Sequence, residues 1–370
     1  MPTEILFGFN SFDRIIDFVT SDSKRKVLLI TGKASFSNSI LNKRFIKQLE
    51  SVGATVDIYS GLTKSDTETL TSAINITRKF NPSIIISIGG GAVLDIGKVC
   101  ACLHTNKGKV GTYLNGGSTI GKKPTFMIAV PTTAGTGSEV SPFVVIWDMK
   151  LKKKISLDSK FLYPAVAVID PILTLSLPAY YTACTGMDAL TQAIEAYWSK
   201  AQNPISDAFA LRAISLIIDN IKRSVKNGKD KVARDNMAKG ALFSGLAFSN
   251  TKTTICHSLS YPMTIHFNIV HGQAVAVTLP LFLNYNYLSI PKEKRYLLLQ
   301  SLGAINLDDA INILNKTMKG IGLKTRLSEL RINKNNLNII IDQGYAPERV
   351  RNAPKIPSKS ELRKLLTSIL

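Results

Sequence analysis

The chain has 370 residues, 45% of them hydrophobic, which excludes a disordered protein and leaves room for two or three domains. The formal net charge of +20 suggests nucleic-acid binding, but the basic residues are spread along the chain without aromatic-interleaved RNA-binding segments or zinc-finger spacing. A lysine-rich genome or attraction of an anionic substrate explains the excess equally well, so we expect no nucleic-acid partner.

The four cysteines show no CxxC spacing, which favours reduced, buried thiols in a cytoplasmic protein; they are Cys100, Cys102, Cys184 and Cys256. The first residues lack the basic and apolar regions of a signal peptide. No stretch approaches the roughly 20 apolar residues of a membrane span. We therefore expect a soluble, cytoplasmic protein without a membrane partner.

Short apolar runs alternate with helical segments in the first half of the chain. The predicted strands are 26–31, 55–59, 84–88, 125–130 and 166–169, the predicted helices are 41–52 and 67–80, and 144–148 with 154–157 form a hairpin. This alternation predicts a parallel sheet with right-handed crossovers.

After residue 171 strand signals become scarce, and helical spacing dominates. The segments concerned are 179–200, 204–227, 231–250 and 251–261. We therefore predict an α/β domain over 1–171 and an all-helical domain over 172–370. A ligand site is expected at a cleft between them.

Two loops that follow strands are candidates for dinucleotide binding. Gly89, Gly90 and Gly91 stand between an apolar strand and a helix, where backbone N–H groups can approach a pyrophosphate. The turn lacks the GxGxxG spacing, and a tight turn without a ligand is the alternative. Thr132 and Thr133 begin a second loop of small, hydroxyl-rich residues, and ligands of open α/β sheets gather at such strand ends.

The candidate metal ligands are one carboxylate, one amide and two imidazoles. Asp188 and Gln192 are four residues apart in a predicted helix and so share a face, while His257 and His271 follow far downstream. Two imidazoles and a carboxylate can hold a divalent metal. A histidine in an apolar context can equally be structural, and His266 is expected in a loop at the surface.

Together these segments resemble the iron-containing (group III) alcohol dehydrogenase family, whose fold is shared with glycerol dehydrogenase and dehydroquinate synthase. The matching segments are 89–98, 131–139, 170–178, 185–197 and 257–272. The resemblance implies an α/β plus all-α, dehydroquinate synthase-like fold. A parallel-sheet nucleotide-binding domain would precede a helical metal-binding domain, and the activity would be that of an NAD(P)-dependent alcohol dehydrogenase or aldehyde reductase.

In that family an aspartate and three histidines hold the metal, and Asp188, His257 and His271 match three of these positions. Gln192 stands at the fourth, where its amide oxygen would bind Fe²⁺ or Zn²⁺ more weakly than imidazole. Tyr261 replaces a further family histidine between the two ligands, so it either serves in catalysis or merely packs.

The resemblance also implies a set of cofactor residues for NAD(P)H. These are Gly90, Gly91, Ala92, Val93 and Asp95 in the glycine segment, Thr132 and Thr133 in the second loop, and Lys154. Gly32 stands where NAD-preferring members often carry an aspartate that binds the ribose hydroxyls. Its absence, next to Lys33, removes repulsion against a 2′-phosphate and makes NADPH acceptable.

Further segments resemble the branch that reduces phosphonoacetaldehyde to 2-hydroxyethylphosphonate; these are 147–154, 156–158, 162–164, 203–207 and 257–262. Lys252 could bind a phosphonate, and a solvated helix lysine explains it equally well. The alternatives are a general short-chain alcohol or aldehyde dehydrogenase, a dehydroquinate synthase-like lyase or glycerol-phosphate enzyme, and a basic nucleic-acid-binding protein on a non-catalytic scaffold. The family suggests a homodimer or larger homo-oligomer.

Overall fold

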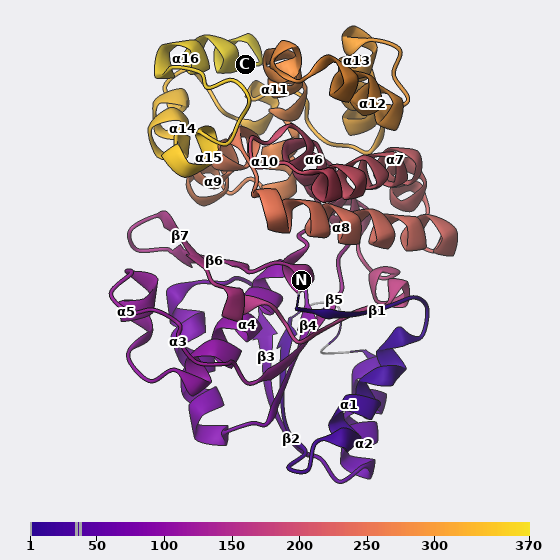
Figure 1. The fold of residues 1–370 in the computed structure, drawn as a ribbon, viewed down its shortest axis with the longest axis vertical. Coiled ribbons are helices and arrows are strands. Elements are labelled where there is room, and N and C mark those ends of the chain that lie inside the picture. Colours follow the sequence, from indigo (N-terminus) through magenta and orange to yellow (C-terminus); the bar gives the residue numbers. More distant parts are fainter. Residues whose placement is uncertain (1, 34–35, 37–38) are drawn as a thin grey trace. The chain divides into compact units, whose positions relative to one another are not determined.

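The computed structural model describes residues 2–33, 36 and 39–370. The chain divides into two compact units, the first formed by Met1–Thr133 with Ser138–Leu177 and the second by Ala134–Gly137 with Pro178–Leu370 (Figure 1). The predicted domains 1–171 and 172–370 stay a prediction; the first unit extends to Leu177, and residues 134–137 group with the second unit.

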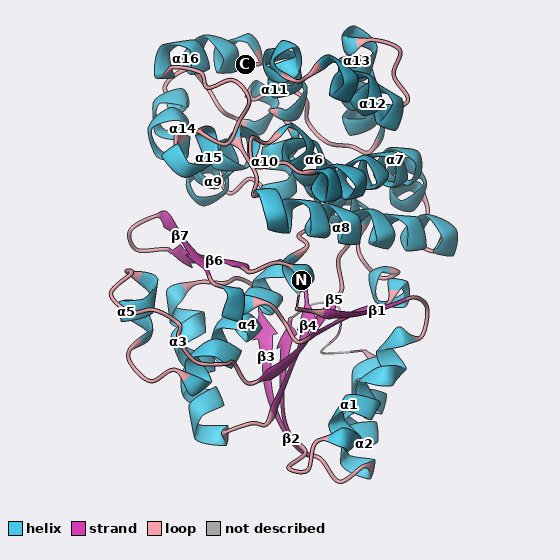
Figure 2. Cartoon of the chain, viewed as in Figure 1, coloured by secondary structure: helices cyan, strands magenta, loops and turns pink. Residues whose placement is uncertain are grey.

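The first unit contains a six-stranded sheet in the order β1-β8-β5-β4-β2-β3, and every neighbouring pair is parallel (Figure 2). The strands are β1 (Glu4–Phe7), β2 (Lys26–Gly32), β3 (Thr55–Leu62), β4 (Ile84–Gly89), β5 (Phe126–Pro131) and β8 (Val166–Ile169). The predicted parallel sheet is confirmed. The edge strand β1 was not predicted, because its four residues lack a continuous buried run.

Helices cover both faces of this sheet, as the apolar strands require. Along β2, Val27 and Leu29 pack on the face of α1 (Ile15–Ser21) and α2 (Ile40–Ser51), whereas the intervening Leu28 and Ile30 pack on the opposite face. That opposite face is covered by α3 (Thr67–Phe80) and α4 (Gly91–Thr105). Successive side chains of a strand point to opposite faces, so a strand buried on both faces is apolar throughout.

A short antiparallel hairpin adjoins the sheet. It pairs β6 (Phe143–Asp148) with β7 (Lys153–Asp158), and the short helix α5 (Val110–Leu114) contacts β7. The hairpin matches the prediction, and Lys152 in its turn and Lys153 at the start of β7 are both exposed.

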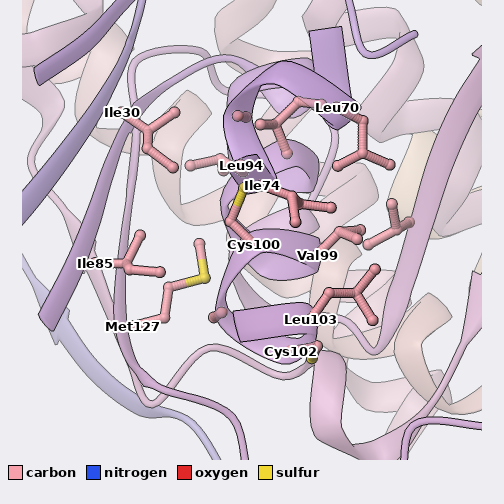
Figure 3. Packing of buried hydrophobic residues seen from close by; sticks show 14 of the residues in the cluster. Ile30, Leu70, Ile74, Ile85, Leu94, Val99, Cys100, Cys102, Leu103 and Met127 are labelled. Carbon is pink, nitrogen blue, oxygen red and sulfur yellow. The ribbon is translucent and has the colours of Figure 1, made fainter. Parts of the chain in front are cut away.

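The cysteines are buried and unpaired, as the sequence predicts. Cys100 and Cys102 lie in the apolar layer around α4, where Figure 3 shows them among leucine, isoleucine and valine side chains. Burial raises the pKa of both thiols to about 12, so they stay protonated at neutral pH.

The second unit is helical. Its helices are α6 (Ala179–Trp198), α7 (Pro204–Lys226), α8 (Lys231–Thr251), α9 (Ile255–Phe267), α10 (His271–Ala276), α11 (Leu279–Asn286), α12 (Lys292–Leu302), α13 (Leu307–Gly320), α14 (Asn336–Gly344), α15 (Pro347–Val350) and α16 (Lys359–Ser368). Helices α6, α7 and α8 pack against one another, α10 packs on α6, and α14 and α15 pack on α9. Asn203 begins α7 with a capping box and a proline in the first turn.

Two sequence predictions in this unit are wrong in position. The helix predicted over 251–261 lies further along the chain, because α8 extends to Thr251 and α9 spans Ile255–Phe267. His266 is not in a loop: it lies in the last turn of α9, and its Nε2 pairs with Gln343 Oε1 at 2.7 Å. Across the described helices of the chain, none has both the length and the apolar composition needed to cross a membrane.

Candidate metal and cofactor sites

One face of helix α6 carries three polar side chains inside the second unit. Asp188, Gln192 and Glu195 are spaced by four and three residues and are 3%, 4% and 0% exposed. Positions i, i+4 and i+7 of a helix lie on one face, so the three side chains project in the same direction. A buried carboxylate requires a partner, and each of the two here has one.

The metal-ligand candidates converge on this face. The Nε2 atom of His257, on α9, lies 3.2 Å from Asp188 Oδ1, and the Nε2 atom of His271, at the start of α10, lies 3.8 Å from it. One ligand atom from each of the three residues lies within 4.8 Å of the other two. Two imidazole nitrogens and a carboxylate oxygen are suitable donors for Fe²⁺ or Zn²⁺, so the three residues fit a divalent metal.

The glycine after His271 lets α10 approach α6. A Cβ atom at Gly272 would lie 1.9 Å from the carbonyl oxygen of Cys184, one helical turn before Asp188. Any larger residue would push the two backbones apart and carry His271 away from Asp188. The glycine thus serves the close packing that brings the ligands together.

Glu195 was missed by the sequence analysis. One of its carboxylate oxygens contacts Nδ1 of His257, and the other accepts hydrogen bonds from Thr254 Oγ1 at 2.6 Å and the Cys256 amide at 2.7 Å. With Nδ1–H donated to Glu195, Nε2 of His257, the atom that faces Asp188, is the nitrogen that would bind a metal. The spacing from Asp188 and Gln192 was the signal that could have identified Glu195.

Ser260 has the corresponding role for His271. Its hydroxyl donates to the carbonyl oxygen of His257 at 2.7 Å and lies 3.2 Å from Nδ1 of His271. Because the hydroxyl has a single hydrogen, it accepts a hydrogen bond from His271 Nδ1–H. Both histidines therefore direct Nε2 toward Asp188, and each would bind a metal through that nitrogen.

Electrostatics keeps Asp188 and Glu195 ionised. Burial by itself would raise the pKa of Asp188, but His271 and the hydrogen bond from His257 outweigh it and lower that pKa. The pKa of Glu195 is likewise lowered against burial, through His257 and Thr254. Burial opposes the charge on His257, yet Glu195 and Asp188 raise its pKa. This concentration of negative charge is suited to a cation.

Gln192, the fourth predicted ligand, has its amide group hydrogen-bonded to groups other than the two histidines. Its Oε1 accepts from Ser244 Oγ at 3.3 Å, while its Nε2 points to the carbonyl oxygen of Thr136 at 3.5 Å. The side chain also hydrogen-bonds Asp188 and helps lower the pKa of that carboxyl. Gln192 thus orients Asp188, and its role as a metal ligand stays a prediction.

Tyr261 lies against the metal candidates. Its ring stacks on His271, with an interplanar angle of 7° and 5.8 Å between ring centroids. Burial raises the pKa of Tyr261, with further raising effects from Glu195 and Asp188 and a lowering effect from Arg349. The phenol therefore stays protonated at neutral pH, and its role in catalysis stays a prediction.

Lys252 is exposed and follows the last residue of α8. The alternative interpretation was a solvated lysine within a helix. The backbone of Lys252 is not helical, because its φ is 60° and its ψ is 172°. This region is nearly restricted to glycine and costs on the order of 1–3 kcal/mol for other residues. Such strain is concentrated at functional sites.

In the first unit the predicted cofactor loops lie where the sheet order reverses. Strand β2 has β3 on one side and β4 on the other, so the switch point lies between β2 and β4. Ligands of open α/β sheets bind outside the carboxyl ends at such a point. Gly32 ends β2 and Gly90 follows β4, which places both at the switch point.

The glycine turn and the second loop are adjacent. The Thr132 amide donates to the Gly89 carbonyl oxygen at 3.0 Å, and a Cβ atom at Gly90 would lie 3.6 Å from Thr133 Cγ2. A Cβ atom at Gly89 would lie only 2.6 Å from Val93, so this turn needs glycine to form. The start of helix α4, including Gly91 and Ala92, therefore presents backbone rather than side chains.

Of the other predicted cofactor residues, Asp95 lies in α4 and Lys154 in β7. Asp95 is buried, and its two carboxylate oxygens accept from Ser138 Oγ at 2.6 Å and the Val145 amide at 2.8 Å. Burial raises the pKa of Asp95, and the charges of Lys98 and Lys154 oppose this rise. These contacts indicate that Asp95 anchors the β6–β7 hairpin to α4, and its role in cofactor binding stays a prediction.

Comparison with known proteins agrees with this arrangement. Residues 2–171 match the family model of iron-containing alcohol dehydrogenase, and residues 182–370 match the C-terminal model of the same family. The chain belongs to the iron-containing alcohol dehydrogenase family. It is 35% identical over 346 residues to alcohol dehydrogenase 4 of Saccharomyces cerevisiae strain YJM789, covering 89% of each chain. It is 34% identical over 296 residues to 1,3-propanediol dehydrogenase of Citrobacter freundii, covering 79% of this chain and 76% of that enzyme.

Solved structures of this family superpose closely on the chain. A 1,3-propanediol oxidoreductase matches with a TM-score of 0.92 at 28% identity, covering all of this chain and 98% of the other. Sulfoacetaldehyde reductase from Bifidobacterium kashiwanohense, solved with NAD⁺, matches with a TM-score of 0.91 at 28% identity, covering 100% and 97%. The predicted family, dehydroquinate synthase-like fold and oxidoreductase class are therefore confirmed.

Proposed function

We propose that the protein reduces a small anionic aldehyde to a primary alcohol with NADH or NADPH, and that the substrate is phosphonoacetaldehyde. The observation that carries the catalytic part is the convergence of Asp188, His257 and His271 within 4.8 Å. These three residues would hold the metal, as Fe²⁺ or Zn²⁺, with Gln192 beside them. When bound, the metal supplies a Lewis acid for the carbonyl oxygen and the reduced nicotinamide supplies the hydride.

The protein's own contribution begins with orientation. Glu195 fixes the ring of His257 and Ser260 fixes that of His271, so both Nε2 atoms are preset toward Asp188. A preorganised polar site requires no rearrangement when charge develops on the substrate.

Tyr261 is the proposed proton donor to the alkoxide oxygen. Burial raises the pKa of its phenol, so the hydroxyl is protonated at neutral pH and has a proton to give. The stacking on His271 holds the ring beside the metal ligands. In this role Tyr261 takes the place of the histidine found at this position in the family.

The cofactor would bind at the switch point of the first unit. The proposed contacts are Gly90, Gly91, Ala92 and Val93 with the pyrophosphate, Thr132 and Thr133 at the second loop, Lys154 from the hairpin, and Gly32 near the adenosine ribose. Because Gly32 has no carboxylate, NADPH and NADH are both accepted.

The choice of phosphonoacetaldehyde has two supports. The first is the resemblance of segments such as 257–262 to the phosphonoacetaldehyde-reducing branch. The second is that a structural relative is named sulfoacetaldehyde reductase, an enzyme for a two-carbon aldehyde that carries an anion. We propose Lys252 as one of the cations that receive the anionic group.

A panel of aldehydes tests this function. Phosphonoacetaldehyde, sulfoacetaldehyde and butyraldehyde are supplied with NADH or NADPH, and absorbance at the reduced-nicotinamide band is followed with added Fe²⁺, Zn²⁺ or chelator. We expect metal-dependent oxidation with the highest kcat/KM for phosphonoacetaldehyde. A preference for butyraldehyde over both anions would contradict the proposed substrate class.

The cytoplasmic location, the homo-oligomeric state and the meeting of cofactor and metal at a cleft stay predictions. Sedimentation of the purified protein measures the oligomeric state, with a dimer or larger assembly expected.

A further inference from the structure

The segment that carries Arg349 is anchored to the helix that carries His257. The hydroxyl of Ser258 donates to the carbonyl oxygen of Gly344 at 2.5 Å and accepts from the amide of Ala346 at 3.3 Å. Ser258 directly follows His257, so the chain leading into Arg349 is tied to α9 beside a proposed metal ligand.

The other end of this segment is tied to the loop between α8 and α9. The side-chain amide of Asn352 donates to the carbonyl oxygens of Thr251 at 2.7 Å and Thr253 at 3.3 Å, and its Oδ1 accepts from Ser199 at 2.9 Å. Arg349 Nη1 donates to Thr253 Oγ1. The guanidinium group is therefore held against this loop from a segment fixed at both ends.

The same loop supplies a second cation. Lys252 stands between Thr251 and Thr253, is exposed, and has the glycine-like backbone angles φ 60° and ψ 172°. An outlier of this kind persists where the surrounding structure holds it and where function uses it. Thr253 thus has one basic residue before it in the chain, Lys252, and a second, Arg349, hydrogen-bonded to its hydroxyl.

Arg349 shares an electrostatic environment with the metal residues. Burial is the main influence on the pKa of Tyr261 and raises it, and the positive charge of Arg349 acts against that rise. The charges of Asp188 and Glu195 act on the same phenol, whose ring stacks on His271. Thr254, which follows Thr253, donates to the Glu195 carboxylate that contacts His257, so the loop that Arg349 holds adjoins a proposed metal ligand.

We propose that Arg349, Lys252 and Thr253 form an anion subsite that binds the phosphonate, sulfonate or carboxylate of a short aldehyde and selects it over uncharged aldehydes. This inference rests on the proposed reduction of an aldehyde at the metal residues. A guanidinium group offers a planar fork to two oxyanion oxygens, lysine adds a point charge, and the threonine hydroxyl can donate. The carboxylate of Glu348, exposed on the same short helix, also acts on Tyr261, so Arg349 is the cation that offsets it.

The kinetic test compares two charge removals on one segment. Arg349→Gln removes the proposed contact, whereas Arg351→Gln removes an equal charge from an exposed position two residues further on. We expect Arg349→Gln to lower kcat/KM for phosphonoacetaldehyde about 10- to 100-fold, mainly through KM, because charge-assisted hydrogen bonds are lost. The ratio of kcat/KM for phosphonoacetaldehyde to that for butyraldehyde should fall by the same factor, whereas both values for Arg351→Gln should stay within about twofold of the unaltered protein.

A binding test avoids dependence on turnover. Metal-free protein is titrated calorimetrically with 2-hydroxyethylphosphonate and, separately, with inorganic phosphate. We expect measurable binding of 2-hydroxyethylphosphonate that Arg349→Gln abolishes and that Arg349→Lys retains in part, since lysine keeps the charge but not the fork. Equal melting temperatures of the variants establish that each one is folded.

The outcomes separate this subsite from the proposed function. If phosphonoacetaldehyde is not reduced but another anionic aldehyde is, and its kcat/KM falls with Arg349→Gln, the substrate is wrong and the subsite stands. If phosphonoacetaldehyde is reduced equally well by Arg349→Gln and Arg351→Gln, the function stands and the subsite is overturned. Equal 2-hydroxyethylphosphonate affinity of those two variants also overturns it.

Discussion

The two candidate sites are made from different parts of the polypeptide. At the switch point of the first unit the chain offers backbone, because Gly89, Gly90 and Gly91 leave the start of α4 without side chains. At the metal candidate of the second unit it offers side chains from three helices, each fixed by a neighbour. The cofactor site therefore requires residues without side chains, whereas the metal site requires three side chains held in fixed positions.

This difference predicts different responses to substitution. Changing one ligand of the side-chain site should remove its chemistry while leaving the backbone site intact. Adding a side chain to the backbone site should change cofactor choice while leaving the metal in place.

The largest effect is expected for His271→Ala. It removes a proposed ligand, so turnover should fall at least about 10³-fold, as for loss of a group on which the chemistry depends. Binding of NADH, followed by fluorescence, should change less than about threefold. His266→Ala is the matched control, since His266 pairs with Gln343 outside the metal set. Full activity of His271→Ala would end the metal hypothesis.

Glu195→Gln should have the next largest effect. The amide keeps the shape but loses the charge that holds His257, and comparable partners of metal ligands are worth about 10- to 100-fold in metal affinity. Metal affinity is measured by competition with a chromogenic chelator. The control is Glu293→Gln, an exposed glutamate on α12. An unchanged metal affinity in Glu195→Gln would show that His257 needs no such support.

Gly32→Asp tests the proposed cofactor site of the first unit, which is made of backbone. A carboxylate at the end of β2 should repel a 2′-phosphate, raising KM for NADPH about tenfold relative to KM for NADH. A Cβ atom at Gly32 would lie 3.3 Å from Val93 Cγ2, so some crowding is expected from any side chain. Gly32→Ala adds the same Cβ without charge, and an identical NADPH/NADH ratio in both variants would refute the electrostatic explanation.

The smallest effect, and one of opposite sign, is expected for Gln192→His. An imidazole on the same helix face could supply a further nitrogen ligand, so metal retention during dialysis should increase about two- to tenfold. Gln192→Leu removes the polar group without adding a ligand and should not increase retention. If both variants retain metal equally, Gln192 lies outside the ligand set.

Much of the fold was predictable because its signals are local. The buried strands of the first unit are continuous apolar runs, and 84–88 was predicted almost to the bounds of β4. Edge strand β1 was missed, since its four residues include a single buried side chain and carry too weak a pattern. A break between the segments 231–250 and 251–261 was predicted, but the start of α9 at Ile255 was not, because the unusual backbone at Lys252 has no sequence signature.

The candidate metal site was predictable as a list of residues but not as a network. Asp188, His257 and His271 follow from residue type and family position. Glu195 and Ser260 do not, because their contacts with the two histidines depend on how α6, α9 and α10 pack. Packing across long sequence separations is what a single sequence leaves unspecified.

The most direct measurement is the anomalous scattering of a crystal of the metal-loaded protein. A single strong peak should lie about 2.0–2.2 Å from an oxygen of Asp188 and from Nε2 of both His257 and His271, as expected for zinc. A loaded metal found away from these three side chains would contradict the account.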